Sequence, residues 1–363
     1  MTDHIQYRTD HSIGRITLNR PQALNALSLD MVRSLSDTLR AWQYDGAISA
    51  VFIDSSSPKA FCAGGDIRFF HQVGTKNPQG GSALLEDFFT EEYALNYLTH
   101  FYSKPIITLL DGIVMGGGMG LAQSGPQCRL AVVTERTKMA MPEVNIGLFP
   151  DVGGTYFLSR TIGQTGTFLA LTGSTINAAD ALYCGLADVF VPVSGLDEMR
   201  NFVNRFDGAD MRGALRDFSS AFTAQCDLSK STLARDQATI DRHFGFDSIT
   251  AIIASLTGDT EPFAQDALYA MQHRSPTMLC VTLEALRRGA TMSLAECLRM
   301  ERTMVRRTFE HGEVLEGIRA AVVDKDQRPA WNPPQLQDVQ SERVAKFFES
   351  AWPQHAHPLR ELT

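Results

Sequence analysis

Two acidic residues stand in an unusually apolar stretch of the chain. Glu143 and Asp151 lie eight residues apart within Met141–Asp151, a segment that also contains two prolines. A carboxylate among apolar neighbours is unfavourable unless it is paired or used, and desolvation raises its pKa toward the range useful for proton transfer. The pattern therefore indicates a general acid or base. The alternative is that Glu143 caps a helix and Asp151 is an ordinary surface acid.

Two glycine-rich turns are the second feature that can do chemistry. Ala63–Asp66 and Gly116–Gly120 each follow a predicted strand and precede a predicted helix. The first N–H groups of a helix have no partner within it, and glycine lets a ligand approach the backbone closely. Two such turns facing each other would supply two N–H donors to one developing oxyanion. The alternative is that the glycines serve only tight turns and close packing; neither turn matches a nucleotide-binding motif.

Six sequence blocks, in this order, resemble the crotonase (enoyl-CoA hydratase/isomerase) superfamily. They are Phe61–Ile67, Glu91–Asn96, Gly112–Gly120, Met141–Glu143 with Gly147–Gly154, His273–Thr277 and Val323–Gln327. Four of these blocks, at 91–96, 147–154, 273–277 and 323–327, are most similar to the branch of 3-hydroxyisobutyryl-CoA hydrolases. Six blocks in the right order are far more specific than any single motif, and they cover nearly the whole chain.

The resemblance implies how the glycine turns would act on an acyl-CoA thioester. The backbone N–H groups of Gly65 and Gly117 would form the oxyanion hole for the thioester carbonyl. Hydratases of the superfamily use two glutamates, and the first of these positions is Gly120 here, which has no side chain. Concerted addition of water to a double bond needs both an acid and a base, so this departure disfavours a hydratase. Glu143 keeps the second position.

For the hydrolase branch, the resemblance implies three acidic residues around the acyl group. Glu143 would act at the thioester carbon, either as the general base for a water or as a nucleophile that forms a mixed anhydride. Asp151 would orient the 3-hydroxyl of the substrate or handle the proton of the departing CoA thiolate. Glu92, expected in a mobile segment after Gly80–Gly81, would contact the same hydroxyl. Buried acids left unpaired without that hydroxyl predict a preference for 3-hydroxyacyl groups.

The resemblance also implies where coenzyme A binds. The residues that match the adenine-binding loop of the family are Ala63, Gly65, Asp66 and Ile67. Arg68 follows immediately, and Lys325 resembles a basic contact of the family; the alternative for each is an ordinary solvated surface charge. Because CoA is part of the substrate, we expect no separate cofactor. The histidine and cysteine spacing shows no metal motif.

Composition limits the partners and the location. Of 363 residues, 33 are Lys or Arg and 41 are Asp or Glu, and the resulting net charge of −8 argues against a nucleic-acid partner. The start of the chain lacks an apolar core and contains Asp3 and Asp10, and the longest nearly apolar stretch, Pro105–Ala122, is interrupted by Asp111 and glycines. We therefore expect no targeting segment, no membrane partner and a cytoplasmic location with reduced cysteines.

The secondary structure predicted around these residues follows an α/β pattern. Strands are predicted over Ile13–Leu18, Ala50–Asp54, Ile106–Leu110 and Leu130–Val133, and Ser28 is the predicted N-cap of a helix. Beyond about residue 195 the apolar spacing becomes helical, over Asn201–Phe222, Thr277–Gly289 and Ser293–Glu310. We expect a crotonase-like ββα spiral core over residues 1–195 and a helical region over 196–363. That region either forms homo-oligomer contacts or folds back on its own subunit.

Together these observations favour an acyl-CoA hydrolase that acts on 3-hydroxyisobutyryl-CoA, with 3-hydroxypropionyl-CoA as a second substrate, in valine catabolism. One alternative is an enoyl-CoA isomerase or hydratase of the same fold, in which Glu143 removes an α-proton. Another is a non-catalytic binding or scaffold protein, such as an RNA-binding relative. The retained Glu143 and the net charge of −8 count against that last alternative.

Overall fold

The computed structural model describes residues 4–77, 81–206, 210–311 and 313–363. Its contacts divide the chain into two units, each built from three stretches of sequence. The sheet unit comprises Met1–Gly65, Leu95–Ala140 and Ile176–Arg235, and the helical unit comprises Asp66–Ala94, Met141–Thr175 and Asp236–Thr363. The predicted boundary at residue 195 separates the part of the sequence that contains the strands from the mostly helical part that follows. As a boundary between domains it stays a prediction.

The sheet unit contains a six-stranded sheet in the order β1–β2–β3–β5–β7–β9. Its strands are Ile5–Asp10, Ile13–Leu18, Ala50–Ser55, Ile106–Leu110, Arg129–Val133 and Val189–Phe190. β1 and β2 are antiparallel, and every later pair of neighbours is parallel. The four predicted strands are confirmed as β2, β3, β5 and β7, because strands buried on both faces form near-continuous apolar runs. β1 escapes prediction because most of its residues are exposed and polar.

A second, three-stranded parallel sheet leads into the glycine turns. Its strands are β4 (Ala60–Cys62), β6 (Ile113–Met115) and β8 (Lys138–Ala140). Along the chain, β4 follows β3, β6 follows β5, and β8 follows β7, so a strand of the large sheet is continued each time by one of the small sheet. Helix α2 (Ile67–Gly74) then follows β4, and α4 (Gly117–Ala122) follows β6. This repetition confirms the expected ββα core.

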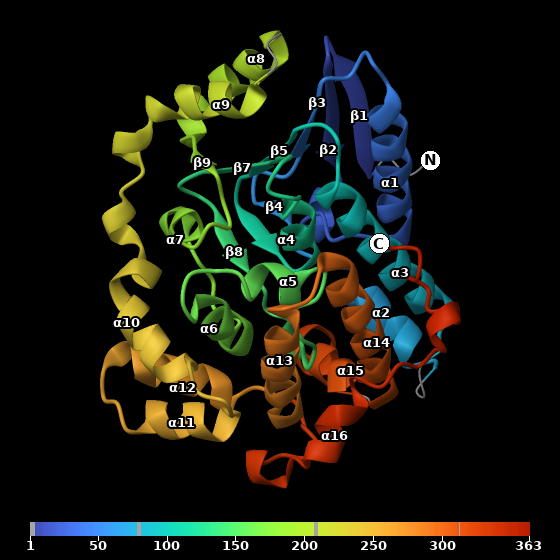
Figure 1. Ribbon diagram of the computed structural model, residues 1–363, viewed down its shortest axis with the longest axis vertical. Coiled ribbons are helices and arrows are strands. Elements are labelled where there is room, and N and C mark those ends of the chain that lie inside the picture. Colours follow the sequence, from blue (N-terminus) through green and yellow to red (C-terminus); the bar gives the residue numbers. More distant parts are fainter. Residues whose placement is uncertain (1–3, 78–80, 207–209, 312) are drawn as a thin grey trace. The chain divides into compact units, whose positions relative to one another are not determined.

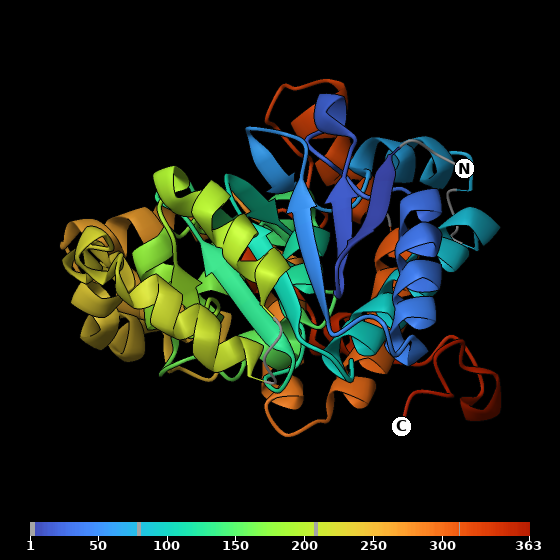
Figure 2. The same cartoon turned by 90° about the horizontal axis from the view of Figure 1, so that it is seen from above.

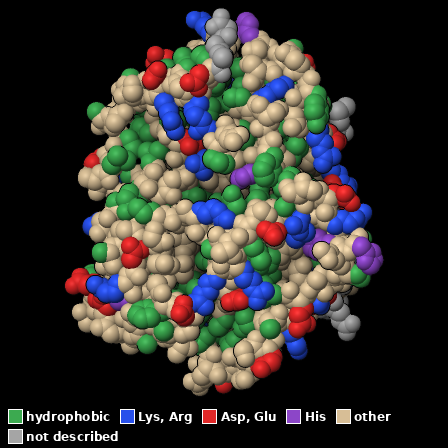
Figure 3. All heavy atoms as spheres, viewed as in Figure 1, with side chains coloured by type: hydrophobic (Ala, Val, Ile, Leu, Met, Phe, Trp, Pro, Cys, Tyr) green, Lys and Arg blue, Asp and Glu red, His purple; other side chains and the backbone are tan. Residues whose placement is uncertain are grey.

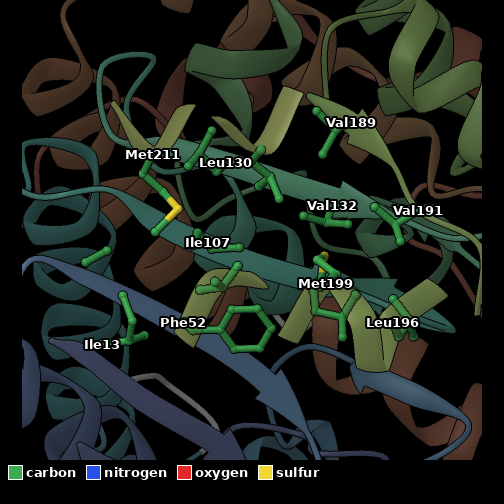
Figure 4. Packing of buried hydrophobic residues seen from close by; sticks show 14 residues of the cluster. Ile13, Phe52, Ile107, Leu130, Val132, Val189, Val191, Leu196, Met199 and Met211 are labelled. Carbon is green, nitrogen blue, oxygen red and sulfur yellow. The ribbon is translucent and has the colours of Figure 1, made fainter. Parts of the chain in front are cut away.

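The core of the sheet unit lies between its parallel strands and two helices, α8 (Leu196–Arg205) and α9 (Met211–Ser220). Phe52, Ile107 and Leu130 project from the strands toward Met199 and Met211 of the helices (Figure 4). All of these side chains are buried. Removal of this apolar surface from water is the main favourable contribution to the stability of the six-stranded sheet.

The helix ends show where local sequence decides the structure. Ser28 caps α1 (Leu29–Tyr44) as predicted, because its side chain accepts the N–H of Met31. Helix α1 packs beside β1 (Figure 2).

The prediction of a single helix over Asn201–Phe222 is wrong, since two helices, α8 and α9, occupy this stretch. The Asp210 side chain accepts the N–H of Gly213 and so begins α9 separately; residues 207–209 lie outside the described residues.

The helical unit is built around α13 and α14, which confirm two of the predicted helices. Its helices, besides α2, are α5 (Gly154–Leu158), α6 (Thr165–Thr172), α11 (Ile249–Thr257), α12 (Pro262–Gln272), α13 (Pro276–Gly289), α14 (Leu294–His311), α15 (Glu313–Ile318) and α16 (Ser341–Lys346). Helix α5 contacts both α13 and α14 (Figure 1). Helices α3 (Ala83–His100) and α10 (Thr232–Phe244) contribute residues to both units, and α7 (Ala178–Tyr183) belongs to the sheet unit.

The surface and the helices bear on the expected partners. None of the helices in the described part of the chain has the length and apolar character that crossing a membrane requires. On the face drawn in Figure 3, Lys and Arg side chains are interspersed with Asp and Glu. Surfaces that bind nucleic acid concentrate positive charge instead.

Candidate active site

Three of the predicted acids are buried in the helical unit. Glu92 lies on α3, Glu143 opens a short 3-10 helix (Glu143–Ile146), and Asp151 stands just before α5. Their exposed fractions are 3%, 7% and 4%, which excludes the alternative of a surface acid for Asp151. The prediction that Glu92 lies in a mobile segment is wrong, because Glu92 lies within helix α3. Gly80, where that segment was expected to begin, lies outside the described residues.

A tyrosine that the sequence analysis did not single out is paired with one of these acids. The hydroxyl of Tyr93 donates a hydrogen bond of 2.6 Å to Oδ2 of Asp151. Burial raises the pKa of Tyr93 well above its usual value, so the phenol keeps its proton and acts as the donor. Burial also raises the pKa of Asp151, to about 6, while the bond from Tyr93 opposes this rise. At neutral pH, therefore, the geometry favours an ionised Asp151 with one oxygen held by Tyr93.

The other two acids have raised pKa values and free acceptor atoms. Burial is the main cause for both Glu92 and Glu143, and the negative charge of Asp151 is the second. Oε1 of Glu92 and Oε2 of Glu143 are buried without a hydrogen-bond partner among the described residues. A buried polar atom of this kind is costly unless a ligand or water satisfies it. A buried acid with a raised pKa and an unpartnered oxygen is a candidate for proton transfer, and Glu143 meets this description.

Glu301 is a fourth buried acid that the sequence analysis did not assign. It lies on α14 and is fully buried. Burial raises the pKa of its carboxyl to about 8, although hydrogen bonds from Thr155 and Gly153 favour the ionised form. A signal for it existed in the sequence: Glu301 follows Leu294 and Leu298 at helical spacing, on the apolar face of the helix predicted over Ser293–Glu310.

The sheet unit brings the two glycine turns against each other. Gly65 follows β4, and Gly117 is the first residue of α4. Between them, Gly64 has φ of +99°, and a Cβ placed there would lie 3.2 Å from the carbonyl oxygen of Met115 and 3.5 Å from the nitrogen of Gly117. Only glycine fits this conformation and this close approach comfortably. The two turns therefore lie against each other, and the role expected for the N–H groups of Gly65 and Gly117 as a pair of donors stays a prediction.

The residues expected to bind adenine form the loop into α2. The N–H of Ala63 donates to the carbonyl of Leu24 at 3.0 Å, which anchors the start of the loop in the sheet unit. In the helical unit, the Asp66 side chain accepts the N–H of Phe69 and caps α2, of which Ile67 is the first residue. The roles expected for Ala63, Gly65, Asp66 and Ile67 in CoA binding stay predictions.

Lys325 lies on an exposed loop of the helical unit, whereas the three acids are buried. Its backbone is in the left-handed region, with φ of +59°. Arg319 holds the residues on both sides of it, with bonds of 2.6 Å to Asp324 and 2.7 Å to Asp326. The loop is therefore well braced and presents Lys325 to solvent; its contact with CoA stays a prediction.

Among the residues that the structure describes, no cluster of three or more His, Cys, Asp and Glu side chains has an arrangement that could hold a metal ion.

Comparisons with known proteins bear on the site as a whole. The model of the enoyl-CoA hydratase/isomerase family matches residues 13–348. A protein of Rattus norvegicus named "3-hydroxyisobutyryl-CoA hydrolase, mitochondrial" is 38% identical over 348 residues, which cover 93% of this chain and 86% of that protein. An Arabidopsis thaliana protein named "Probable 3-hydroxyisobutyryl-CoA hydrolase 3" is 36% identical, with 93% of this chain and 89% of that protein covered.

Solved structures of similar length share the fold. A structure titled as a carnitinyl-CoA dehydratase from Mycobacterium thermoresistibile is 37% identical with a TM-score of 0.87, covering 97% of this chain and 98% of that one. One titled as an enoyl-CoA hydratase from Rhodobacter sphaeroides is 35% identical with a TM-score of 0.84, covering 96% and 98%. The names of these similar proteins thus comprise both thioester hydrolysis and addition or removal of water.

Proposed function

This chain belongs to the enoyl-CoA hydratase/isomerase family, and on that premise we propose that it hydrolyses the thioester of 3-hydroxyisobutyryl-CoA to free CoA and the 3-hydroxy acid. The names of the rat and Arabidopsis relatives, which match over 93% of the chain, support this substrate. The observation that carries the proposal is the group of buried acids, in which Tyr93 holds Asp151 and both Glu92 and Glu143 keep an unpartnered oxygen.

The thioester carbonyl would bind at the two glycine turns. Backbone N–H groups of Gly65 and Gly117 would donate to its oxygen, and these donors stabilise the negative charge that develops when the carbonyl carbon is attacked. The close packing of the two turns around Gly64 supports this assignment, because it would hold both donors in place before the substrate binds. Preorganised donors of this kind need no rearrangement during the reaction.

Glu143 would act at the thioester carbon. As a general base it would take a proton from a water that adds to the carbonyl; as a nucleophile it would form a mixed anhydride that water then hydrolyses. In both cases the C–S bond breaks, and the CoA thiolate leaves and takes up a proton. Asp151 has one oxygen occupied by Tyr93, and its other oxygen would orient the 3-hydroxyl or handle that proton. Glu92 would accept the hydroxyl through its unpartnered Oε1.

A second candidate is addition or removal of water, the activity in the titles of the two similar structures. A hydratase needs an acid and a base on the two carbons of the double bond. The position at which the family's hydratases carry their first glutamate is Gly120, which is buried in α4 and has no side chain. Double-bond migration needs only one base, so the single Glu143 is compatible with an isomerase.

We further propose four finer properties of this protein. A role in valine catabolism, activity toward 3-hydroxypropionyl-CoA, a cytoplasmic location and a homo-oligomer are proposed from the sequence resemblance and composition. "Mitochondrial" in the name of the rat relative describes that protein. We also propose that the substrate is the only source of CoA and that no further cofactor takes part.

The proposal is tested by the release of free CoA thiol from 3-hydroxyisobutyryl-CoA by the wild type and by Glu143→Gln. We expect turnover by the wild type and a loss of roughly a hundredfold or more in the variant, because an amide neither accepts a proton nor attacks the carbonyl. Glu284→Gln, which changes an exposed glutamate paired with Arg288 on α13, is the matched control. Equal turnover by Glu143→Gln and Glu284→Gln would contradict the assignment of Glu143.

A further inference from the structure

The turn that carries Asp151 has a strained backbone. Val152 has φ of +53° and Gly153 has φ of +85°. The left-handed region is unfavourable for a β-branched residue, because its side chain crowds the backbone. Such a conformation persists only where neighbouring groups hold it in place, and it is found mostly at functional sites. The neighbours that hold Val152 therefore matter for the acid next to it.

The side chain of Glu301 binds the turn that contains Val152 through three hydrogen bonds. Its Oε2 accepts the N–H of Gly153 at 2.8 Å, and its Oε1 accepts both the N–H of Thr155 at 3.0 Å and the hydroxyl of Thr155 at 2.5 Å. Helix α14, which carries Glu301, packs against α5, which contains Thr155. Three donors aimed at one fully buried carboxyl make a strong, geometrically specific anchor.

The hydrogen bonds of Glu301 also act on Asp151, through the backbone of the turn. The N–H of Gly154 donates to the carbonyl of Asp151 at 2.6 Å, so the backbone of Asp151 moves with the turn that Glu301 clamps. The side chain of Asp151 in turn meets Tyr93 at 2.6 Å. A shift of the turn by a fraction of this length would lengthen the Tyr93–Asp151 bond beyond hydrogen-bonding distance.

The residue next to Glu301 holds the helix that carries Tyr93. Nε of Arg302 donates to the hydroxyl of Thr90 at 2.9 Å, and the same guanidinium binds Glu86. Thr90 and Glu86 both lie on α3, three and seven residues before Tyr93. The Arg302 side chain is 1% exposed. Two consecutive buried residues of α14 thus fix both partners of the Tyr93–Asp151 pair.

We propose that Glu301 is a positioning residue for the hydrolysis, which sets Asp151 against Tyr93 by clamping the strained turn at Val152. This inference rests on the proposed function for its kinetic readout. The alternative is that Glu301 only caps α5 and contributes to folding. The two differ in what happens to the Tyr93–Asp151 pair and to turnover when Glu301 is changed without loss of the fold.

The first variant is Glu301→Gln, which keeps the length of the side chain but sets its amide NH₂ against an N–H donor of the turn. We expect kcat for release of CoA to fall by roughly tenfold with KM changed less than about twofold, because a misplaced acid costs rate more than binding. Thr155→Ala removes one donor and leaves both backbone bonds, so a smaller loss of kcat is expected. Thr155→Ala also replaces Glu301→Gln as the test if Glu301→Gln does not fold. Glu284→Gln is the control for an exposed glutamate.

A double variant separates positioning from a merely structural role. If Glu301 acts through the Tyr93–Asp151 pair, the loss of kcat in Tyr93→Phe with Glu301→Gln will be close to that of Tyr93→Phe alone. Independent structural damage would multiply the two losses. Multiplied losses, or an unchanged kcat in both Glu301→Gln and Thr155→Ala, would overturn the inference.

A crystal structure of Glu301→Gln makes the test independent of the reaction. We expect the distance between Tyr93 Oη and Asp151 Oδ2 to exceed hydrogen-bonding range. Retention of the bond at about the distance in the wild type would overturn the inference even if kcat fell. If the wild type itself releases no CoA, the proposed function fails, and the inference is still decided by this structure.

Discussion

The hydroxyl of Tyr93 and the carboxylate of Asp151, 58 residues apart in the sequence, form a buried hydrogen bond of 2.6 Å. Glu92 and Glu143 have raised pKa values in part because of the charge on Asp151. The tyrosine therefore influences all three acids: it favours the ionised form of Asp151, and the charge of Asp151 favours protonation of its neighbours.

Removal of this hydrogen bond should shift the pH dependence of the enzyme. Burial raises the pKa of Asp151 and the bond from Tyr93 lowers it, and the net result is a pKa of about 6. In Tyr93→Phe the pKa of Asp151 should rise, so that the ionised form is lost at a higher pH as the pH falls. We expect the acidic limb of the kcat profile to move to higher pH and kcat at neutral pH to fall roughly tenfold. Tyr269→Phe, at an exposed tyrosine, should leave the profile in place, and an unmoved limb in Tyr93→Phe would exclude this role.

The buried glutamates should reduce stability at neutral pH. Burial raises the pKa of Glu143 above its value in the unfolded chain, so the folded state binds protons more tightly. Below the pKa of Glu143 in the unfolded chain, about 4.3, this difference does not lower the free energy of unfolding. The free energy of unfolding then falls as the pH rises toward the pKa of Glu143 in the folded state. Glu143→Gln should therefore raise the free energy of unfolding at pH 7 by on the order of 1 kcal/mol, with little gain near pH 4. Denaturant unfolding at both pH values measures this, and a gain of equal size at pH 4 would point to another cause.

Glu92 should determine whether the enzyme requires the 3-hydroxyl. Its unpartnered Oε1 is buried, so a substrate without the hydroxyl leaves it unsatisfied. We expect Glu92→Ala to lower the ratio of kcat/KM for 3-hydroxyisobutyryl-CoA to that for isobutyryl-CoA by roughly tenfold or more. Glu91→Gln, on the adjacent residue of α3, is the control. A ratio that stays the same in Glu92→Ala would assign the recognition of the hydroxyl elsewhere.

The glycine turns should tolerate no side chain where they meet. A methyl group on Gly64 would lie 3.2 Å from the carbonyl of Met115, in a conformation with φ of +99°. Gly64→Ala should therefore push the Gly65 turn away from Gly117 and lower kcat by roughly ten- to a hundredfold, since both donors must point at one oxygen. Gly46→Ala, where nothing lies within 4 Å of the added group, should keep full activity. Normal kcat in folded Gly64→Ala would contradict the oxyanion-hole assignment.

Local sequence predicts those parts of the fold that depend on local burial. The strands at 13–18 and 106–110 are buried on both faces and read as apolar runs, so their bounds match β2 and β5. The helix over Asn201–Phe222 fails because the N-cap at Asp210 divides a stretch whose apolar spacing alone looks continuous. The strands of the small sheet, such as β4 (Ala60–Cys62), are too short for their pattern to be recognised.

Local sequence likewise indicates some residues of the candidate site and not others. Glu143 and Asp151 stand out because acids are rare in so apolar a segment, whereas Glu92 was identified through resemblance. Pairings such as Tyr93 with Asp151, or Glu301 with Gly153 across 148 residues, depend on how helices pack, which no local pattern encodes. The sequence shows only that Glu301 lies on the apolar face of its helix, where a charged residue needs partners.

Mass spectrometry of the products formed from 3-hydroxyisobutyryl-CoA in water enriched in ¹⁸O tests the proposed hydrolysis most directly. Hydrolysis gives free CoA and the 3-hydroxy acid, and the carboxyl of the acid gains oxygen from the solvent over repeated turnovers. We predict this outcome. Formation of the unsaturated acyl-CoA, with the thioester intact and no free CoA, would show that the chain removes water from its substrate and would contradict the proposed hydrolysis.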